Sequence, residues 1–308
     1  MKVGFIGLGT MGAHMAANLQ KSGFELVVHD MRRAAADRHI AAGATWAESP
    51  RAVAEQVEVV FTSLPGPPEV EEVALGANGI LAGLKEGGAY FDLSTNSPTL
   101  VRKLNAQFAE QHKYMLDAPV SGGPAGAQSG KLAIWVGGDE QQFQRFKGVL
   151  DGFSDQARYI GGIGSGSIAK LVHNMAGYAV QTALAEVFTM GVKAGLEPGA
   201  LFEAVRQGAL GRRRMFDRLA DQFLSGIYEP PAFALRLAYK DVTLATDLAK
   251  EFKVPMRIAE ATRAEMLEAL NRGWADRDSR SSMLLQTERA GVSISVPRER
   301  LKAIVDKD

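Results

Sequence analysis

The stretch GLGTMG, residues 7–12, constrains the fold of this chain more than any other feature. It follows an apolar run, VGFI at residues 3–6, and opens a segment with apolar residues at helical spacing. A strand, a Gly-x-Gly-x-x-Gly turn and a helix in this order are typical of dinucleotide binding. The turn allows a sharp bend, close approach of a pyrophosphate to the backbone, and close helix packing. The residues that we expect to contact a cofactor here are Gly7, Leu8, Gly9, Thr10, Met11 and Gly12.

A carboxylate stands where an adenosine ribose would be recognised. Asp30 ends the next apolar run, ELVVHD at residues 25–30, and can accept hydrogen bonds from both ribose hydroxyls. It would repel a 2′-phosphate, which favours NAD over NADP. Arg32 and Arg33 lie close enough to bind such a phosphate, so NADP remains open. A tight turn beside an incidental strand-ending aspartate is the alternative interpretation of the two features.

The pattern of apolar residues predicts two domains. Up to about residue 160, strand patterns alternate with helical ones such as 10–22 and 33–42, which favours a largely parallel sheet with helices on both faces. The later strands have shorter connections and are expected to add an antiparallel edge. The strands are predicted at 2–7, 25–30, 57–63, 89–93, 114–118, 131–136 and 157–160. The rest of the chain has only helical patterns, at 165–195, 198–208, 234–251 and 256–271. We therefore expect an α/β domain over 1–161 and an all-helical domain over 162–308.

Composition excludes several classes of function. Lys plus Arg number 35 and Asp plus Glu number 35, so no net field attracts nucleic acid or an anionic membrane. With no cysteine and five scattered histidines, we expect neither thiolate chemistry nor a metal site. Glycines interrupt the N-terminal apolar stretch, and polar residues interrupt the apolar segment 171–196. We therefore expect a cytoplasmic protein without a membrane span, and neither nucleic acid nor membrane as a partner.

A lysine follows a glycine-rich segment at the start of the long helix predicted over 165–195. Lys170 and Asn174 are four residues apart and share one helix face. Apolar neighbours would desolvate Lys170 and lower its pKa, so that it can exchange a proton with a substrate oxygen near neutral pH. His173 lies on another face, and we expect it to be structural. A lysine paired at the surface is the alternative for Lys170.

Three further segments carry polar groups of interest. In DAPVSGGPAGA, residues 117–127, the hydroxyl of Ser121 and the backbone of Gly122 and Gly123 could hold a carboxylate, although a simple turn is the alternative. Lys240 and Asp241 interrupt an apolar helix pattern, where an ion pair or a solvated face is the local explanation. The basic segment GALGRRRMF, residues 208–216, is either a solvated turn or the source of a contact to a second anionic group of the substrate, from Arg212, Arg213 or Arg214.

Five of these stretches together resemble the β-hydroxyacid dehydrogenase family, which includes 3-hydroxyisobutyrate dehydrogenases and tartronate semialdehyde reductases. They occur in the family's order, as GFIGLGTMGAHMAANL, DLSTNSP (92–98), DAPVSGGPAGA, GGIGSGSIAKLVHN and KDVTLA (240–245). The resemblance implies that Lys170 is the catalytic acid and base and that Asn174 orients the substrate. It implies that the substrate carboxylate is held by Ser121, Gly122 and Gly123. It further implies cofactor contacts from the glycine turn, Asp30, Leu64, Pro65, Thr95 and Lys240.

The same resemblance implies an architecture and an activity. The expected architecture is an N-terminal Rossmann-type doubly wound sheet, a long interdomain helix and an all-α domain, in a homodimer or homotetramer. The expected activity is reversible hydride transfer between NAD(H) and a small 3-hydroxy acid or semialdehyde. One alternative is an imine reductase-like NADP enzyme, although such relatives usually have another residue where Lys170 stands. A 6-phosphogluconate dehydrogenase usually has a much longer helical domain. A non-catalytic NAD-binding regulatory protein would need no lysine at this position.

Overall fold

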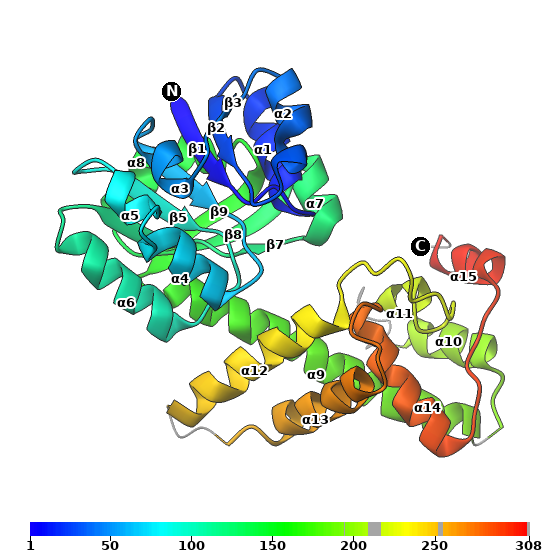
Figure 1. Cartoon of the computed structure of the whole chain (residues 1–308). Helices are drawn as coiled ribbons and strands as arrows, with labels where there is room; N and C mark the ends of the chain where they lie inside the picture. Colours follow the sequence, from blue (N-terminus) through cyan, green and yellow to red (C-terminus); the bar gives the residue numbers. More distant parts are fainter. Residues whose placement is uncertain (194, 209–216, 252–254, 307–308) are drawn as a thin grey trace. The chain divides into compact units, whose positions relative to one another are not determined.

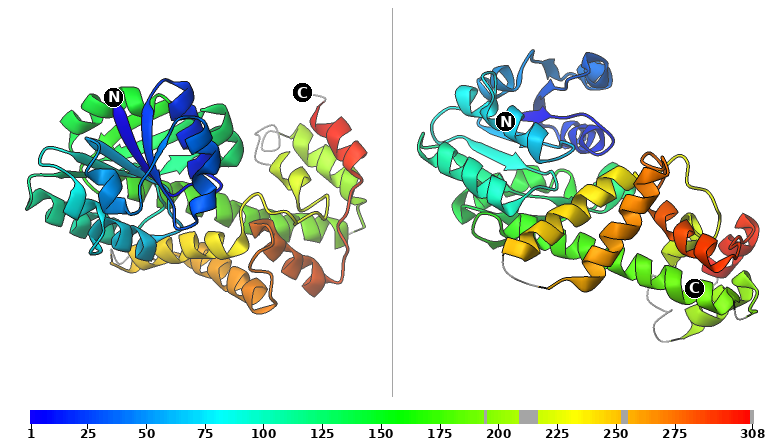
Figure 2. Two further views of the ribbon diagram at one scale, coloured as in Figure 1. Left: turned by 45° about the horizontal axis from the view of Figure 1, so that its top comes forward. Right: turned by 60° about the horizontal axis from the view of Figure 1, so that its bottom comes forward.

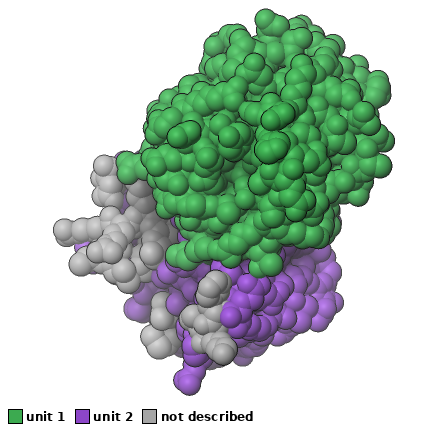
Figure 3. Space-filling model, turned by 90° about the vertical axis from the view of Figure 1, so that its left-hand side faces the viewer, with its two compact units in different colours: residues 1–172 green, residues 173–308 purple. Residues whose placement is uncertain are grey.

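The computed structural model describes residues 1–193, 195–208, 217–251 and 255–306. It divides into two compact units, Met1–Val172 and His173–Asp308, which are coloured separately in Figure 3. The division falls inside the long helix α9 (Ser165–Lys193), whereas the predicted domain boundary lies just before this helix. The assignment of 1–161 and 162–308 as functional domains therefore stays a proposal.

Unit 1 contains a nine-stranded sheet (Figure 1). Its strand order is β3-β2-β1-β4-β5-β6-β8-β7, with β9 paired to β8. The first six strands are parallel, and their order reverses direction between β1 and β4, as in doubly wound dinucleotide-binding folds. The expected antiparallel edge is confirmed, because β8 runs antiparallel to β6 and β7. The strands are β1 (Lys2–Ile6), β2 (Glu25–His29), β3 (Thr45–Trp46), β4 (Val59–Thr62), β5 (Ala89–Asp92), β6 (Tyr114–Asp117), β7 (Val120–Ser121), β8 (Leu132–Gly137) and β9 (Ser154–Gly161).

Both faces of the central strands β1, β4 and β5 are buried, which explains why these strands are apolar at nearly every position. Phe5, Phe61 and Phe91 are in register across β1, β4 and β5 and pack on one face with α1, α7 and α8. Their neighbours Val60 and Tyr90 point to the other face, which α3, α4, α5 and α6 cover. Each fully buried side chain of this size contributes about 1.5–3 kcal/mol to folding. The two apolar layers therefore fix the strand register, and with it the position of every turn at the strand ends.

Two of the unit 1 helices begin with a side chain that caps their N-terminus. Ser49 accepts a hydrogen bond from the Ala52 N–H at the start of α3, and Asp139 accepts one from the Gln142 N–H at the start of α8. The helical patterns named from the sequence, 10–22 and 33–42, correspond to α1 and to η1 with α2. The helices are α1 (Gly12–Lys21), η1 (Arg33–Ala36), α2 (Asp37–Ala41), α3 (Pro50–Ala54), α4 (Pro67–Leu75), α5 (Ile80–Gly83), α6 (Pro98–Ala109), α7 (Gly123–Ser129) and α8 (Glu140–Leu150).

Unit 2 has helices and no strand among its described residues, apart from one isolated bridge between Ala234 and Asp278. Its core includes Phe188 of α9, Phe202 of α10 and Leu301 of α15. Helices α12 and α13 lie side by side, as the views in Figures 1 and 2 show. None of the described helices is both long and apolar enough to cross a membrane. Beyond α9 the unit has α10 (Pro198–Gln207), α11 (Asp217–Asp221), α12 (Leu235–Glu251), α13 (Arg257–Asn271), η2 (Ser279–Met283), α14 (Leu284–Ala290) and α15 (Arg298–Val305).

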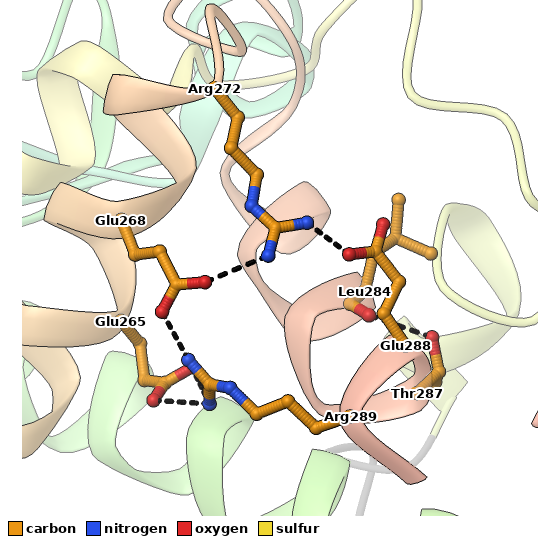
Figure 4. Close-up of polar contacts among 7 residues, drawn as sticks. All are labelled: Glu265, Glu268, Arg272, Leu284, Thr287, Glu288 and Arg289. Atoms are coloured by element: carbon orange, nitrogen blue, oxygen red, sulfur yellow. Dashed lines mark hydrogen bonds and ion pairs between the residues drawn. The ribbon is translucent and has the colours of Figure 1, made fainter. Parts of the chain in front are cut away.

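An ionic network joins α13 to α14 on the surface of unit 2 (Figure 4). Arg289 pairs with Glu265 at 2.6 Å and also with Glu268. Arg272 pairs with Glu268 at 2.8 Å and also with Glu288. The two guanidinium groups and the hydrogen bonds that they donate lower the pKa of Glu268. All five side chains remain substantially exposed, so solvent screens these pairs.

Candidate active site

The glycine turn at residues 7–12 has the geometry that a diphosphate requires. Gly7 has a φ of +90°, and a Cβ there would lie 2.3 Å from the Ser63 carbonyl oxygen. A Cβ on Gly12 would lie 1.9 Å from the Gly7 carbonyl oxygen. A Cβ on Gly9 would meet no atom within 4 Å, so the middle glycine faces open space beside the start of α1. The first and third glycines are therefore needed by the fold, and the second leaves room for a ligand.

A cavity of about 500 Å³ adjoins this turn. Asp30 follows β2 directly, and its carboxylate accepts hydrogen bonds from the Leu8 N–H at 2.7 Å and the Arg32 N–H at 2.8 Å. The Asp30 side chain is 11% exposed, so the carboxylate holds the turn in place and still reaches solvent. The cavity is lined by Leu8, Gly9, Thr10, Ala13, Arg32, Ala34, Ala35 and Arg38. The residues present fit an adenosine diphosphate group.

The two arginines that follow Asp30 differ in their surroundings. Arg32 lines the cavity. Arg33 pairs with Asp37 at 3.0 Å, and its guanidinium lies 4.6 Å from the ring centroid of Trp46. A 2′-phosphate would therefore meet Arg32 rather than Arg33 at this cavity.

Two loops with predicted cofactor contacts are held together by one buried carboxylate. The loop after β4 contains Leu64 and Pro65, and the loop after β5 contains Thr95; the Leu64 N–H donates to Ser94 Oγ at 2.9 Å. Asp92, the last residue of β5, accepts hydrogen bonds from the Ser94 N–H at 3.0 Å, Thr62 Oγ1 at 3.1 Å and Asn96 Nδ2 at 2.8 Å. Burial raises the pKa of Asp92, and the hydrogen bonds from Asn96, Ser94 and Thr62 oppose that shift.

The segment predicted to hold the substrate carboxylate forms a turn between β7 and α7. Ser121 ends β7 and is half-buried, while Gly122 and Gly123 are exposed. Their φ angles are +138° and +63°, which L side chains rarely adopt. The turn therefore presents backbone at the N-terminus of α7, beside the Ser121 hydroxyl. Exposed backbone N–H groups in such a turn can bind an anion, and the assignment of these residues to the substrate carboxylate stays a prediction.

The segment that carries Lys170 begins against the same part of the sheet. Asp117 is the last residue of β6, and its carboxylate accepts the Gly164 N–H at 2.7 Å and the Ser167 N–H at 2.6 Å. Burial raises the pKa of Asp117, and the hydrogen bonds from Ser167 and Gly164 oppose that shift. Lys170 follows on the next turn of α9 and is half-buried.

In unit 2 a buried carboxylate organises the other predicted polar residues. Asp241 of α12 is 2% exposed, and its Oδ1 lies 2.8 Å from Lys240 Nζ. Asn174 Nδ2 donates to Asp241 Oδ2 at 2.6 Å, and the Tyr178 hydroxyl donates to the same oxygen at 3.4 Å. Burial and the charge of Asp241 raise the pKa of Tyr178. The expected ion pair between Lys240 and Asp241 is confirmed, whereas a solvated position for Asp241 is wrong, because this residue occupies the packed face of α12.

Sequence reasoning missed two buried carboxylates near the predicted residues, Asp92 and Asp117, and it did not predict the burial of Asp241. Asp92 and Asp117 each end an apolar strand pattern, as Asp30 does, and this shared position was the signal. Asp241 lies three residues after Ala238 and four before Ala245, which puts it on the apolar face of its helix. Arg212, Arg213 and Arg214 lie outside the described residues. Among the described residues, no group of three or more His, Asp or Glu side chains could hold a metal.

A doubly wound sheet with this glycine turn indicates a dinucleotide-binding domain, and the comparisons with known proteins identify an NAD(P)-dependent oxidoreductase. Residues 2–161 match the NAD binding domain of 6-phosphogluconate dehydrogenase, and residues 164–286 match the NAD-binding part of NADP-dependent 3-hydroxyisobutyrate dehydrogenase. The chain belongs to the β-hydroxyacid dehydrogenase family and acts on CH–OH groups.

Individual relatives support this membership along the whole chain. A 2-(hydroxymethyl)glutarate dehydrogenase from Eubacterium barkeri is 34% identical over 96% of this chain and 98% of its own. An NAD-dependent L-serine dehydrogenase from Pseudomonas aeruginosa is 34% identical over 90% of this chain and 95% of its own. The crystal structure of a 3-hydroxyisobutyrate dehydrogenase from Salmonella typhimurium superposes with a TM-score of 0.82 at 28% identity, over 92% of this chain and 99% of that one. The imine reductase-like and non-catalytic alternatives are not favoured.

Proposed function

We propose that this protein transfers a hydride reversibly between NAD(H) and a small 3-hydroxy acid, whose oxidised form is a semialdehyde or ketone. The observation that carries the proposal is the common support of Lys170 and the Ser121 loop (residues 118–123): Asp117 ends the strand before the loop and binds the first turn of the lysine's helix. The residue that we assign as acid and base and the turn that we assign to the substrate carboxylate are thus both attached to Asp117. The substrates in the names of the three relatives share a carboxylate and a hydroxyl on the third carbon.

The cofactor would be held by groups at the carboxyl ends of neighbouring strands. The glycine turn would hold the diphosphate, and Asp30 would accept hydrogen bonds from the ribose and disfavour a 2′-phosphate. Leu64, Pro65 and Thr95 would flank the nicotinamide half, and we assign Lys240 a further cofactor contact. When bound, the nicotinamide ring accepts or supplies the hydride.

Lys170 would exchange a proton with the substrate oxygen. In reduction its ammonium group stabilises the charge that develops on the substrate oxygen and donates a proton to it. In oxidation the neutral amine removes that proton. Asn174 lies one turn further along α9 and would orient the substrate, with its amide fixed by Asp241. Ser121, Gly122 and Gly123 would bind the carboxylate, so that the reacting carbon is held in one orientation.

The decisive experiment follows the absorbance of NADH over a panel of 3-hydroxy acids and semialdehydes. For the substrate that is turned over, Lys170→Ala should lower kcat by roughly a thousandfold, in the range of lost acid–base catalysis. NAD binding should stay close to that of the wild type. Lys193→Ala, at the other end of the same helix, is the matched control and should retain activity, since Lys193 binds the Ala290 carbonyl in unit 2. Normal turnover by the Lys170 variant would contradict the assignment.

We further propose a homodimer or homotetramer in the cytoplasm. Large apolar side chains remain exposed on unit 2, among them Leu196 at 52%, Ile258 at 60% and Leu267 at 41%. We propose that contact with a second chain covers some of these side chains. Light scattering coupled to gel filtration should give a mass of two or four times 33.0 kDa. A mass of one chain would contradict this part of the proposal.

A further inference from the structure

We infer that Asp117 is a positioning residue that sets the distance between the Ser121 loop, residues 118–123, and Lys170. This inference rests on the proposed function, which assigns the Ser121 loop to the substrate carboxylate and Lys170 to the proton. Asp117 is 1% exposed and ends β6, so its backbone leads directly into the loop. Its side chain binds the start of α9, so one residue is attached to both parts.

The junction is built for direct contact between the sheet and the helix. A Cβ on Gly137 would lie 2.5 Å from Asp117 Oδ1 and 2.9 Å from the Gly166 nitrogen. A Cβ on Gly166 would lie 2.3 Å from the Trp135 carbonyl oxygen and 2.7 Å from that of Asp117. Two glycines, one on β8 and one on α9, therefore leave just enough space for the carboxylate to reach the helix backbone. A residue with a side chain at either position would force the helix away from the strand ends.

The two hydrogen bonds also suit the charge and the shape of a carboxylate. The first N–H groups of a helix have no partner within the helix, and its N-terminus carries partial positive charge. Asp117 supplies one oxygen to Gly164 and the other to Ser167. The bond to Ser167 fixes the helix three residues before Lys170, which is less than one turn away. Rotation or sliding of the helix start would therefore displace the lysine relative to the loop.

Asp117→Asn tests this role, because an amide offers only one acceptor oxygen to the two N–H donors. Misplacement of about 1 Å costs up to about a hundredfold in rate, so kcat/KM for the hydroxy acid should fall roughly 10- to 100-fold. The loss should be divided between a lower kcat, from the displaced lysine, and a higher KM, from the displaced loop. The dissociation constant of NADH should stay within about twofold of the wild-type value, because the glycine turn lies on other strands. Gly137→Ala should give the same pattern with the carboxylate retained, and it decides the matter where Asp117→Asn fails to fold.

Asp139→Asn is the control, because Asp139 also caps a helix, α8, at 2.9 Å from the Gln142 nitrogen, but is exposed and attached to neither part. It should leave kcat and KM unchanged. Amide hydrogen exchange on the full chain gives a second readout: residues 118–123 and 164–172 should both exchange faster in Asp117→Asn. Unchanged kcat/KM in the folded Asp117 and Gly137 variants would overturn the inference. If the wild type turns over no 3-hydroxy acid, the proposed function fails, and exchange alone decides: acceleration in both segments supports the coupling, and acceleration in one or neither overturns it.

Discussion

The buried strand-end carboxylates of unit 1 and the surface carboxylates between α13 and α14 of unit 2 serve opposite purposes. In unit 1, Asp92 and Asp117 are each 1% exposed and accept N–H and O–H groups from the loops at the strand ends. In unit 2, Glu265, Glu268 and Glu288 pair with two arginines across α13 and α14 on an exposed surface. The first arrangement uses few groups with fixed partners, and the second uses many groups with long side chains.

The energetics of the two arrangements differ accordingly. A buried carboxylate that loses its place leaves several unsatisfied donors, each costing about 1–3 kcal/mol. An exposed ion pair contributes about 0–1 kcal/mol, because solvent and salt screen it and ordering two long side chains costs entropy. The number of ion pairs is therefore a poor guide to their contribution to stability here. The single carboxylates of unit 1 should control loop position and function, and the network of unit 2 should be dispensable.

The largest effect is expected for Asp92→Ala. This change leaves the Ser94 N–H, Thr62 Oγ1 and Asn96 Nδ2 without their acceptor in a closed interior. We expect unfolding free energy to fall by about 2–4 kcal/mol. Urea denaturation of the full chain measures this loss. Affinity for NADH should fall as well, because Ser94 holds the backbone of Leu64.

Asp92→Asn is the matched control for that variant. An amide oxygen can still accept some of these hydrogen bonds, so the loss should be smaller than for alanine. The expected difference between the two groups of carboxylates would be contradicted if Asp92→Ala destabilised the protein no more than removal of an arginine from the α13–α14 network.

Most of the fold and part of the site could be predicted from the sequence, for identifiable physical reasons. The long helices α9, α12 and α13 repeat an apolar pattern over several turns, and the central strands are continuous apolar runs. Strands β3 and β7 were missed because two residues carry no periodic pattern. Helices such as α14 were missed because their stability comes from packing on a neighbour rather than from a pattern of their own.

The buried carboxylates could not be predicted because their role depends on contacts between distant segments. Asp117 meets the Gly164 N–H across 47 positions of sequence, and Asp241 meets Asn174 across 67. Asp30 was found because its partner, the glycine turn, has a recognisable motif of its own. Strand-ending aspartates without such a motif look the same in sequence, whether they bind a cofactor or hold a loop.

A buried histidine of unit 1, His39, should make the stability of this unit sensitive to acid. His39 is 1% exposed; Nδ1 lies 2.9 Å from Gln20 Oε1, and Nε2 accepts a hydrogen bond from Arg38 Nε at 3.1 Å. Burial, and then the charge of Arg38, lower its pKa from 6.5 to about 4. Because the folded pKa lies below the unfolded one, the stability contribution is complete above pH 6.5 and is lost as the pH falls through 4. We expect a loss of roughly 1–3 kcal/mol over this window.

His39→Gln should remove this pH dependence, and denaturation at several pH values measures the difference between variant and wild type. The difference also separates the histidine from Asp92 and Asp117. Their raised pKa values act in the opposite direction, since a carboxyl that protonates more readily in the folded state favours folding at low pH. Parallel stability curves for the two proteins between pH 6.5 and 4 would show that His39 does not contribute.

A more moderate effect is expected at Asp30, the carboxylate that follows β2 and accepts a hydrogen bond from the glycine turn. Asp30→Asn removes the negative charge and keeps an acceptor for the Leu8 N–H, so the turn should stay folded. With Arg32 lining the cavity, the ratio of kcat/KM for NADP to that for NAD should rise about tenfold, equivalent to about 1.4 kcal/mol. Arg32→Ala in the same background should reverse the gain, and Arg33→Ala should not. An unchanged ratio in Asp30→Asn would mean that this carboxylate serves the turn alone.

The smallest effect is expected for Arg289→Ala, although it removes two ion pairs of the network. Arg289 pairs with both Glu265 and Glu268, but all three side chains are partly exposed. The expected loss of unfolding free energy is below about 1 kcal/mol and should shrink further at high salt, because mobile ions screen exposed charges. Denaturation at low and high ionic strength measures both quantities. A loss as large as that of Asp92→Ala, and insensitive to salt, would show that the network acts as a cooperative unit and would reverse the ranking of the two regions.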